Sequence, residues 1–158
     1  MKDRVSLPRL LSDACLWAAG VLLIINVGDM ALNIFLRYVF KYSFVWAEEF
    51  ARFSLIWVVM LAATPALYYG DHMFIDFVVK KLPPLFRLPL LWFKRIVVTF
   101  ILILMTYYGV KYAVEVKMFI TLAMNISKAI PVSAIPVGSA LALLEFILLE
   151  LERGGKRA

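Results

Sequence analysis

Four long apolar runs dominate this chain and restrict it to an all-α membrane fold. Each run comes close to the roughly 20 mostly apolar residues that a helix needs to cross about 30 Å of hydrocarbon. We place the spans at about 14–36, 47–69, 91–112 and 130–150. The runs are too long for strands and lack the apolar/polar alternation of a membrane barrel.

Composition supports this prediction. With 64% hydrophobic residues and a mean hydropathy of +0.89, the chain has too little polar surface to cover a soluble globule. The connections between the runs are short, and none is long enough to hold a soluble domain. We therefore predict a single integral membrane domain over residues 1–158, with four transmembrane helices.

Positive charge is spread unevenly over the two sides that four spans create. Eleven Lys and Arg residues lie in the two tails and the 70–95 connection, against five in the other two connections. The positive-inside rule then puts both termini in the cytoplasm. The net charge of +6 is read as a signal of topology and of contact with anionic membrane lipids. No soluble basic face indicates nucleic acid as a partner.

Two segments outside the spans have the pattern of short amphipathic helices at the membrane interface. In the 70–95 connection, Met73, Phe74, Phe77 and Val78 recur at helical spacing before Pro83-Pro84, which cannot continue a helix. A second such helix is expected at about 113–127. For both segments, ordinary loop anchoring and a specific scaffold role stay open as alternatives.

The polar residues inside the first span share one helix face. Asn26, Asp29, Asn33 and Arg37 are spaced by three, four and four residues. That face cannot point at lipid, because an ionised group in hydrocarbon costs a few kcal/mol or more. We therefore expect it to meet another helix or another protein.

The second span opens with a complementary set of groups. Glu48, Glu49 and Arg52 follow Trp46, which suits the lipid headgroup region. Counted along the two antiparallel helices, Asp29 and Arg52 lie roughly 12 Å and 9 Å below the outer interface, and we predict a salt bridge between them. Glu48 and Glu49 can also reach Arg52 at the i+4 and i+3 positions. These groups either hold the two spans together or bind a partner protein.

Other single residues indicate structural roles. Cys15 is expected to be a small residue that packs between helices. The first apolar run follows Lys2, Arg4 and Arg9, as the apolar part of a secretory signal peptide would, but it is too long for one, so we predict a helix of the mature protein. Pro65 should interrupt the hydrogen-bond ladder of the second span and kink it, and the Thr64 hydroxyl is a candidate to satisfy a freed carbonyl.

No pattern of catalytic or metal-binding residues is present. His72 is the only histidine, so this chain alone cannot supply two axial haem ligands. Nucleophile elbows, phosphate loops and metal-binding spacings are also absent from the sequence. We predict neither an enzyme nor a bound cofactor or metal.

The chain resembles the small membrane subunit of tripartite ATP-independent periplasmic (TRAP) transporters, the DctQ-like family. The resemblance covers almost the whole chain in order. The residues that carry it are Arg37-Tyr38-Val39-Phe40, Ser43, Trp46-Ala47-Glu48-Glu49, Arg52, Trp57, Gly70-Asp71-His72, Asp76, Leu82-Pro83-Pro84, Ile130-Pro131 and Ala134-Ile135-Pro136-Val137-Gly138.

This resemblance implies a scaffold function. In this family an extracytoplasmic binding protein delivers an organic acid to a membrane pair, which imports it with sodium. The large multi-span permease subunit holds the substrate and ion sites, while the small subunit anchors it and helps to dock the periplasmic substrate-binding protein. Carried over to this chain, the interface candidates are Trp46, Glu48, Glu49 and Arg52 toward the outside, with Asp71, His72 and Asp76 toward the inside.

Two other classes of function stay open. The chain could be a self-sufficient small transporter, assembled as a homo-oligomer, with Asp29 or Glu49 as its proton-coupled carboxylate. It could also be the membrane anchor of a redox enzyme whose other chain supplies the cofactor ligands. Transport by the purified protein alone would indicate the first, and a co-purifying catalytic chain the second.

Overall fold

The computed structural model describes residues 7–70 and 84–155. The predicted interfacial helix between residues 71 and 83 and the candidates Asp71, His72 and Asp76 lie outside these residues.

The described chain is built of helices. They are α1 (Leu7–Val39), α2 (Val45–Gly70), α4 (Pro84–Glu115), the 3-10 helix η1 (Val116–Met118), α5 (Ala129–Val132) and α6 (Ala134–Gly155). By length and composition, four helical segments can cross a membrane: Leu7–Val39, Val45–Tyr69, Trp92–Met118 and Ala129–Glu152. The predicted all-α class with four helices that can span a membrane is confirmed, and each helical segment extends past at least one end of its predicted span.

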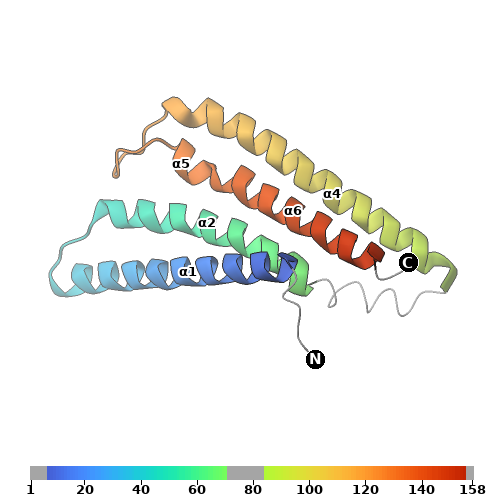
Figure 1. Cartoon of the computed structure of the whole chain (residues 1–158). Helices are drawn as coiled ribbons and strands as arrows, with labels where there is room; N and C mark the ends of the chain where they lie inside the picture. Colours follow the sequence, from blue (N-terminus) through green and yellow to red (C-terminus); the bar gives the residue numbers. More distant parts are fainter. Residues whose placement is uncertain (1–6, 71–83, 156–158) are drawn as a thin grey trace.

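The long helices pack in the order α1, α2, α6, α4 (Figure 1). Helix α1 lies along α2, and α6 lies between α2 and α4. The first residue of α1 and the last of α6 are at the same end of the bundle, as four crossings require (Figure 1). The α1–α2 connection and the segment between η1 and α5 are together at the opposite end, which the charge pattern predicts to be the outer one.

Small side chains make the contacts between these helices. Ala134 and Ala142 of α6 and Ala47 and Ala51 of α2 are all buried. At Gly138 a Cβ atom would lie 2.6 Å from Met60 Cβ and 2.8 Å from the Met60 carbonyl oxygen, so α6 touches the backbone of α2 there. Membrane helices associate through such small residues, because lipid removes the hydrophobic driving force that large side chains provide in water.

Large apolar side chains point outward instead. Trp17 is 76% exposed and Trp92 61%, and the bulky residues of α4 are mostly exposed as well. In a soluble protein this surface would aggregate, whereas here it provides the face for lipid or for another membrane subunit.

The predicted amphipathic helix at 113–127 is wrong. Helix α4 continues to Glu115, η1 adds one turn, and residues 119–128 form a closed loop with an isolated bridge between Ile120 and Ser127. In this loop Lys128 N donates to Phe119 O at 2.8 Å and Thr121 N to Ile126 O at 2.8 Å. These bonds across the loop replace the i to i−4 pattern of a helix.

Helix α2 is a single helix through Pro65. The Thr64 hydroxyl is buried but has no hydrogen-bond partner, so it does not satisfy a freed carbonyl as predicted. Cys15 is buried with a free thiol, as expected of a packing residue.

Candidate functional site between helices α1 and α2

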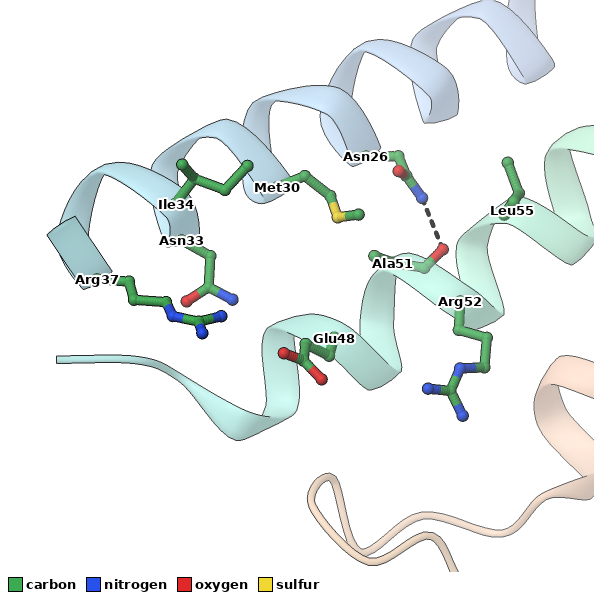
Figure 2. A pocket seen from close by; sticks show the side chains of 9 residues that line it. All are labelled: Asn26, Met30, Asn33, Ile34, Arg37, Glu48, Ala51, Arg52 and Leu55. Carbon is green, nitrogen blue, oxygen red and sulfur yellow. Dashed lines mark hydrogen bonds between the residues drawn. The ribbon is translucent and has the colours of Figure 1, made fainter.

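An open cavity of about 400 Å³ lies between α1 and α2, toward the end where they are connected. It brings together five of the predicted site residues, which come from both helices (Figure 2). Its lining consists of Asn26, Met30, Asn33, Ile34, Arg37, Glu48, Ala51, Arg52 and Leu55.

Asn26 closes the deep end of this cavity and joins the two helices. Its Nδ2 donates to Ala51 O at 2.8 Å (Figure 2). The same Nδ2 also donates to Ser54 Oγ at 2.5 Å. Ser54 Oγ in turn donates to Phe50 O at 2.8 Å. Both Asn26 and Ser54 are buried, so water cannot replace these bonds.

Substitution of Asn26 by leucine is expected to weaken the α1–α2 contact. Interhelical hydrogen bonds in membranes contribute roughly 0.6–2 kcal/mol, and we expect a loss of that size in unfolding by denaturing detergent. Ser54→Ala is the matched variant, because Asn26 then keeps its bond to Ala51 O. The loss of stability in Ser54→Ala should therefore be smaller than in Asn26→Leu. Equal stability of Asn26→Leu and the unmodified protein would contradict this role.

Asn33 fixes the connection between the helices. Its Oδ1 accepts a hydrogen bond from Phe44 N at 3.2 Å, one residue before α2 begins. This bond satisfies a backbone donor next to the helix start, where the first N–H groups have no helical partner. Lys41 in the same connection has φ 54°, a left-handed conformation that the chain uses for the reversal.

Arg37, Glu48 and Arg52 are exposed around the mouth of the cavity. Of the ion pairs between described residues, one joins Arg9 to Asp13 and another joins Arg95 to Glu150, and none includes these three groups. Two guanidinium groups and one carboxylate therefore lie at this surface without counter-charges from the rest of the described chain. Such a surface can bind a protein or lipid that carries complementary charge.

The predicted Asp29–Arg52 salt bridge is wrong for the described structure. Asp29 Oδ2 is buried and has no hydrogen-bond partner. The reason is rotational: the buried side of α2 that faces Asn26 is occupied by Ala51, and Arg52 is about 100° further around the helix. Similar depth in the membrane therefore did not bring the two groups together.

Glu49 does not pair with Arg52 either, but binds the outer loop of its own chain. Its carboxylate accepts backbone hydrogen bonds from Leu122 at 3.2 Å, Ala123 at 3.1 Å and Met124 at 3.0 Å. Three successive N–H groups around one carboxylate form an anion-binding turn. This contact attaches the loop at 119–128 to the start of α2.

Trp46 is at the same end of the molecule. It is 44% exposed, and its ring centroid is 5.6 Å from that of Phe44. Its position beside the α1–α2 connection is compatible with the predicted place among lipid headgroups. Trp46 and Glu48 are thus exposed near the cavity mouth, whereas the Glu49 carboxylate is hydrogen-bonded to the loop at 119–128.

The charged side chains at the cavity mouth can form ion pairs or hydrogen bonds with a molecule that covers them. Within residues 7–70 and 84–155 no group of three His, Cys, Asp or Glu side chains could hold a metal ion. The cavity offers no nucleophile next to a base. Its charged groups are arranged for contact at a surface.

Sequence reasoning missed two features of the described structure. The partner of Glu49 is a set of backbone N–H groups, for which residue type gives no signal. Glu145, the other missed residue, is a carboxylate well inside the fourth apolar run, five residues before Glu150 at its end, and that position could have identified it as a buried polar group.

Comparison with known proteins gives consistent results. Residues 26–153 match the family described as "Tripartite ATP-independent periplasmic transporters, DctQ component". Over 131 residues, 83% of this chain, the sequence is 28% identical to the sialic acid TRAP transporter permease protein SiaT of Haemophilus influenzae, of which the match covers 21%. It is also 29% identical over 107 residues, 68% of this chain, to a protein of another H. influenzae strain named a TRAP transporter small permease protein, of which 61% is covered.

Proposed function

Because the chain belongs to the DctQ family of TRAP transporter components, we propose that it is the small membrane subunit of a sodium-driven importer of organic acids. In this proposal it lies in the bacterial inner membrane with both termini in the cytoplasm. It anchors a large permease subunit, which holds the substrate and ion sites. It also helps to dock a periplasmic substrate-binding protein.

The observation that carries this proposal is the charged mouth of the α1–α2 cavity. Arg37, Glu48 and Arg52 are exposed there without ion-pair partners from the described chain. Arg52 is predicted to lie within the membrane, where a charged group is costly unless a partner covers it. A second membrane subunit with opposite charges would satisfy these three groups, and the exposed apolar faces of α1 and α4 would extend that contact.

The loop held by Glu49 supports a role in docking. Leu122 of this loop is 99% exposed, although Glu49 fixes the loop backbone. Met118, the last residue of η1 and next to the loop, is 91% exposed. A rigid backbone that presents apolar side chains loses little conformational entropy on binding. In the proposed topology this loop faces the periplasm, where the binding protein would approach.

The substrate class is inferred from the comparisons. The longer relative is named for sialic acid, and this chain matches only 21% of its length. An organic acid is therefore the proposed cargo of the complete transporter.

Affinity purification in mild detergent tests the assembly. We expect a large multi-span permease to co-purify with the tagged protein in near-equal amount. The double variant Arg37→Gln/Arg52→Gln should lower this recovery several-fold, because it removes both unpaired cations. Lys111→Gln, which removes an exposed charge from α4, is the matched control and should not change it.

The other outcome would change the functional class. Recovery of the chain only as a homo-oligomer that transports after reconstitution would contradict the scaffold role. Asp29, whose Oδ2 atom is buried without a hydrogen-bond partner, would then be the first candidate for proton coupling.

A further inference from the structure

A polar cluster is buried where α1, α2 and α6 meet, at the end of the bundle opposite the cavity. Ser12, Thr64 and Glu145 are each 0% exposed, and Cys15 is 6% exposed. Glu145 follows Ala134, Gly138 and Ala142 along the inner face of α6, at helical spacing. A long carboxylate side chain therefore occupies a face that is otherwise built of very small residues.

The oxygen atoms of this cluster have no partners. Ser12 Oγ, Thr64 Oγ1 and both carboxylate oxygens of Glu145 are buried and make no hydrogen bond by strict geometry. The Ser12 hydroxyl nevertheless lies beside the Glu145 carboxyl, and Thr64 lies beside the Cys15 thiol. Buried polar groups are almost always hydrogen-bonded in native proteins. This arrangement therefore indicates that the cluster binds either a proton, which would let its oxygen atoms hydrogen-bond to one another, or a ligand.

Among the side chains that the structure describes, none supplies a counter-ion to Glu145. From α1 it faces Ser12 and the titratable Cys15, and Thr64 of α2 lies beside that thiol. On α4, which also packs against α6, Arg95 pairs with Glu150 at 3.0 Å. On α1, Arg9 lies 4.0 Å from Asp13. An ionised Glu145 would thus be a bare charge in the bundle core, which costs several kcal/mol.

A metal cation is poorly suited to neutralise the Glu145 carboxylate in this cluster. Hard cations need about six oxygen ligands, whereas the cluster offers one carboxylate, two hydroxyls and a soft thiol. A proton needs only one of the carboxylate oxygens and leaves an O–H group that can donate to a neighbouring hydroxyl.

We propose that Glu145 is a proton-binding site of this bundle, held as a neutral carboxylic acid whose O–H donates a hydrogen bond to Ser12 Oγ. The bound proton joins α6 to α1 through the core. The Ser12 hydroxyl can then donate in turn to the free carbonyl oxygen of the acid or to a nearby acceptor. This role is independent of any transport partner.

Infrared difference spectroscopy of the full chain in lipid nanodiscs tests this site. The spectrum of the unmodified protein minus that of Glu145→Gln should contain the carbonyl stretch of a protonated carboxylic acid at neutral pH. Glu150→Gln is the matched control, because Glu150 pairs with Arg95; its difference spectrum should contain ionised carboxylate bands. Carboxylate bands in the Glu145 difference spectrum would overturn the proposal.

Ser12→Ala gives a second readout that does not depend on a Glu145 variant. Loss of the acceptor should shift the acid carbonyl band to higher frequency, since that band responds to hydrogen bonding. Should Glu145→Gln fail to fold, this band decides the question in the unmodified protein and Ser12→Ala alone. Its absence from the unmodified protein, or an unchanged frequency in Ser12→Ala, would contradict the proposed bond.

Discussion

Replacement of Gly138 by alanine is expected to disrupt the packing of α2 against α6. A Cβ atom at this position would lie 2.6 Å from Met60 Cβ, 2.8 Å from its carbonyl oxygen and 2.9 Å from its carbonyl carbon. Two of these atoms belong to the α2 backbone, so no rotamer change relieves the clash. Overpacking of a close-packed interior costs about 1–3 kcal/mol, and Gly138→Val should cost more than Gly138→Ala.

Unfolding of purified protein by denaturing detergent, followed by circular dichroism, measures this loss. Gly20→Ala and Gly28→Ala are matched controls, because nothing lies within 4 Å of a Cβ atom at either position. Alanine has the higher helix propensity, so these two variants should be as stable as the unmodified protein or slightly more stable. If Gly138→Ala behaved like Gly20→Ala, the close contact between α2 and α6 would be disproved.

The membrane helices were predictable because length and hydrophobicity decide them. A run of about 20 apolar residues has few alternatives to a helix, since lipid leaves backbone groups no other partner. The ends of the helices were less predictable: α1 begins at Leu7 and α4 reaches Glu115, beyond the apolar runs. Once the backbone hydrogen bonds of a helix have formed, polar residues at the membrane–water interface can extend the helix at little cost in free energy.

The candidate site was predictable in part. Of the four residues predicted to share a polar face of α1, Asn26, Asn33 and Arg37 line the cavity beside α2, whereas Asp29 does not. Which atoms meet across the helices was not predictable, because depth along two helices does not define their rotation. Ala51 faces α1, so Arg52 points elsewhere, and the hydrogen bonds of the interface belong to Asn26.

The loop between η1 and α5 shows a different limit. Its apolar pattern with scattered charges was compatible with an amphipathic helix. The structure instead satisfies its backbone donors with Glu49, which is more than 70 residues earlier in the chain. A contact between a side chain and a distant backbone leaves no periodic signal in the sequence, so only the three-dimensional arrangement reveals it.

Replacement of Glu49 by alanine is expected to release this loop while leaving the bundle folded. The change removes the acceptor for the N–H groups of Leu122, Ala123 and Met124. Hydrogen bonds to a charged acceptor are stronger than neutral ones, so amide exchange at these positions should accelerate on the order of tenfold. Glu49→Gln keeps a neutral acceptor and should give an intermediate rate. Hydrogen–deuterium exchange with mass spectrometry on a peptide covering 119–128 measures the effect.

Glu48→Gln separates this local role from a general effect of charge at the start of α2. The two carboxylates are adjacent in sequence, but Glu48 lines the cavity, whereas Glu49 binds the loop. Amide exchange at residues 122–124 should therefore be the same in Glu48→Gln as in the unmodified protein. Glu48→Gln should instead differ from the unmodified protein in the amount of large permease that co-purifies. Equal acceleration in both variants would mean that the loop responds to net charge and not to the three hydrogen bonds. Faster exchange in Glu49→Ala alone would establish that one carboxylate fixes the loop proposed to face the binding protein.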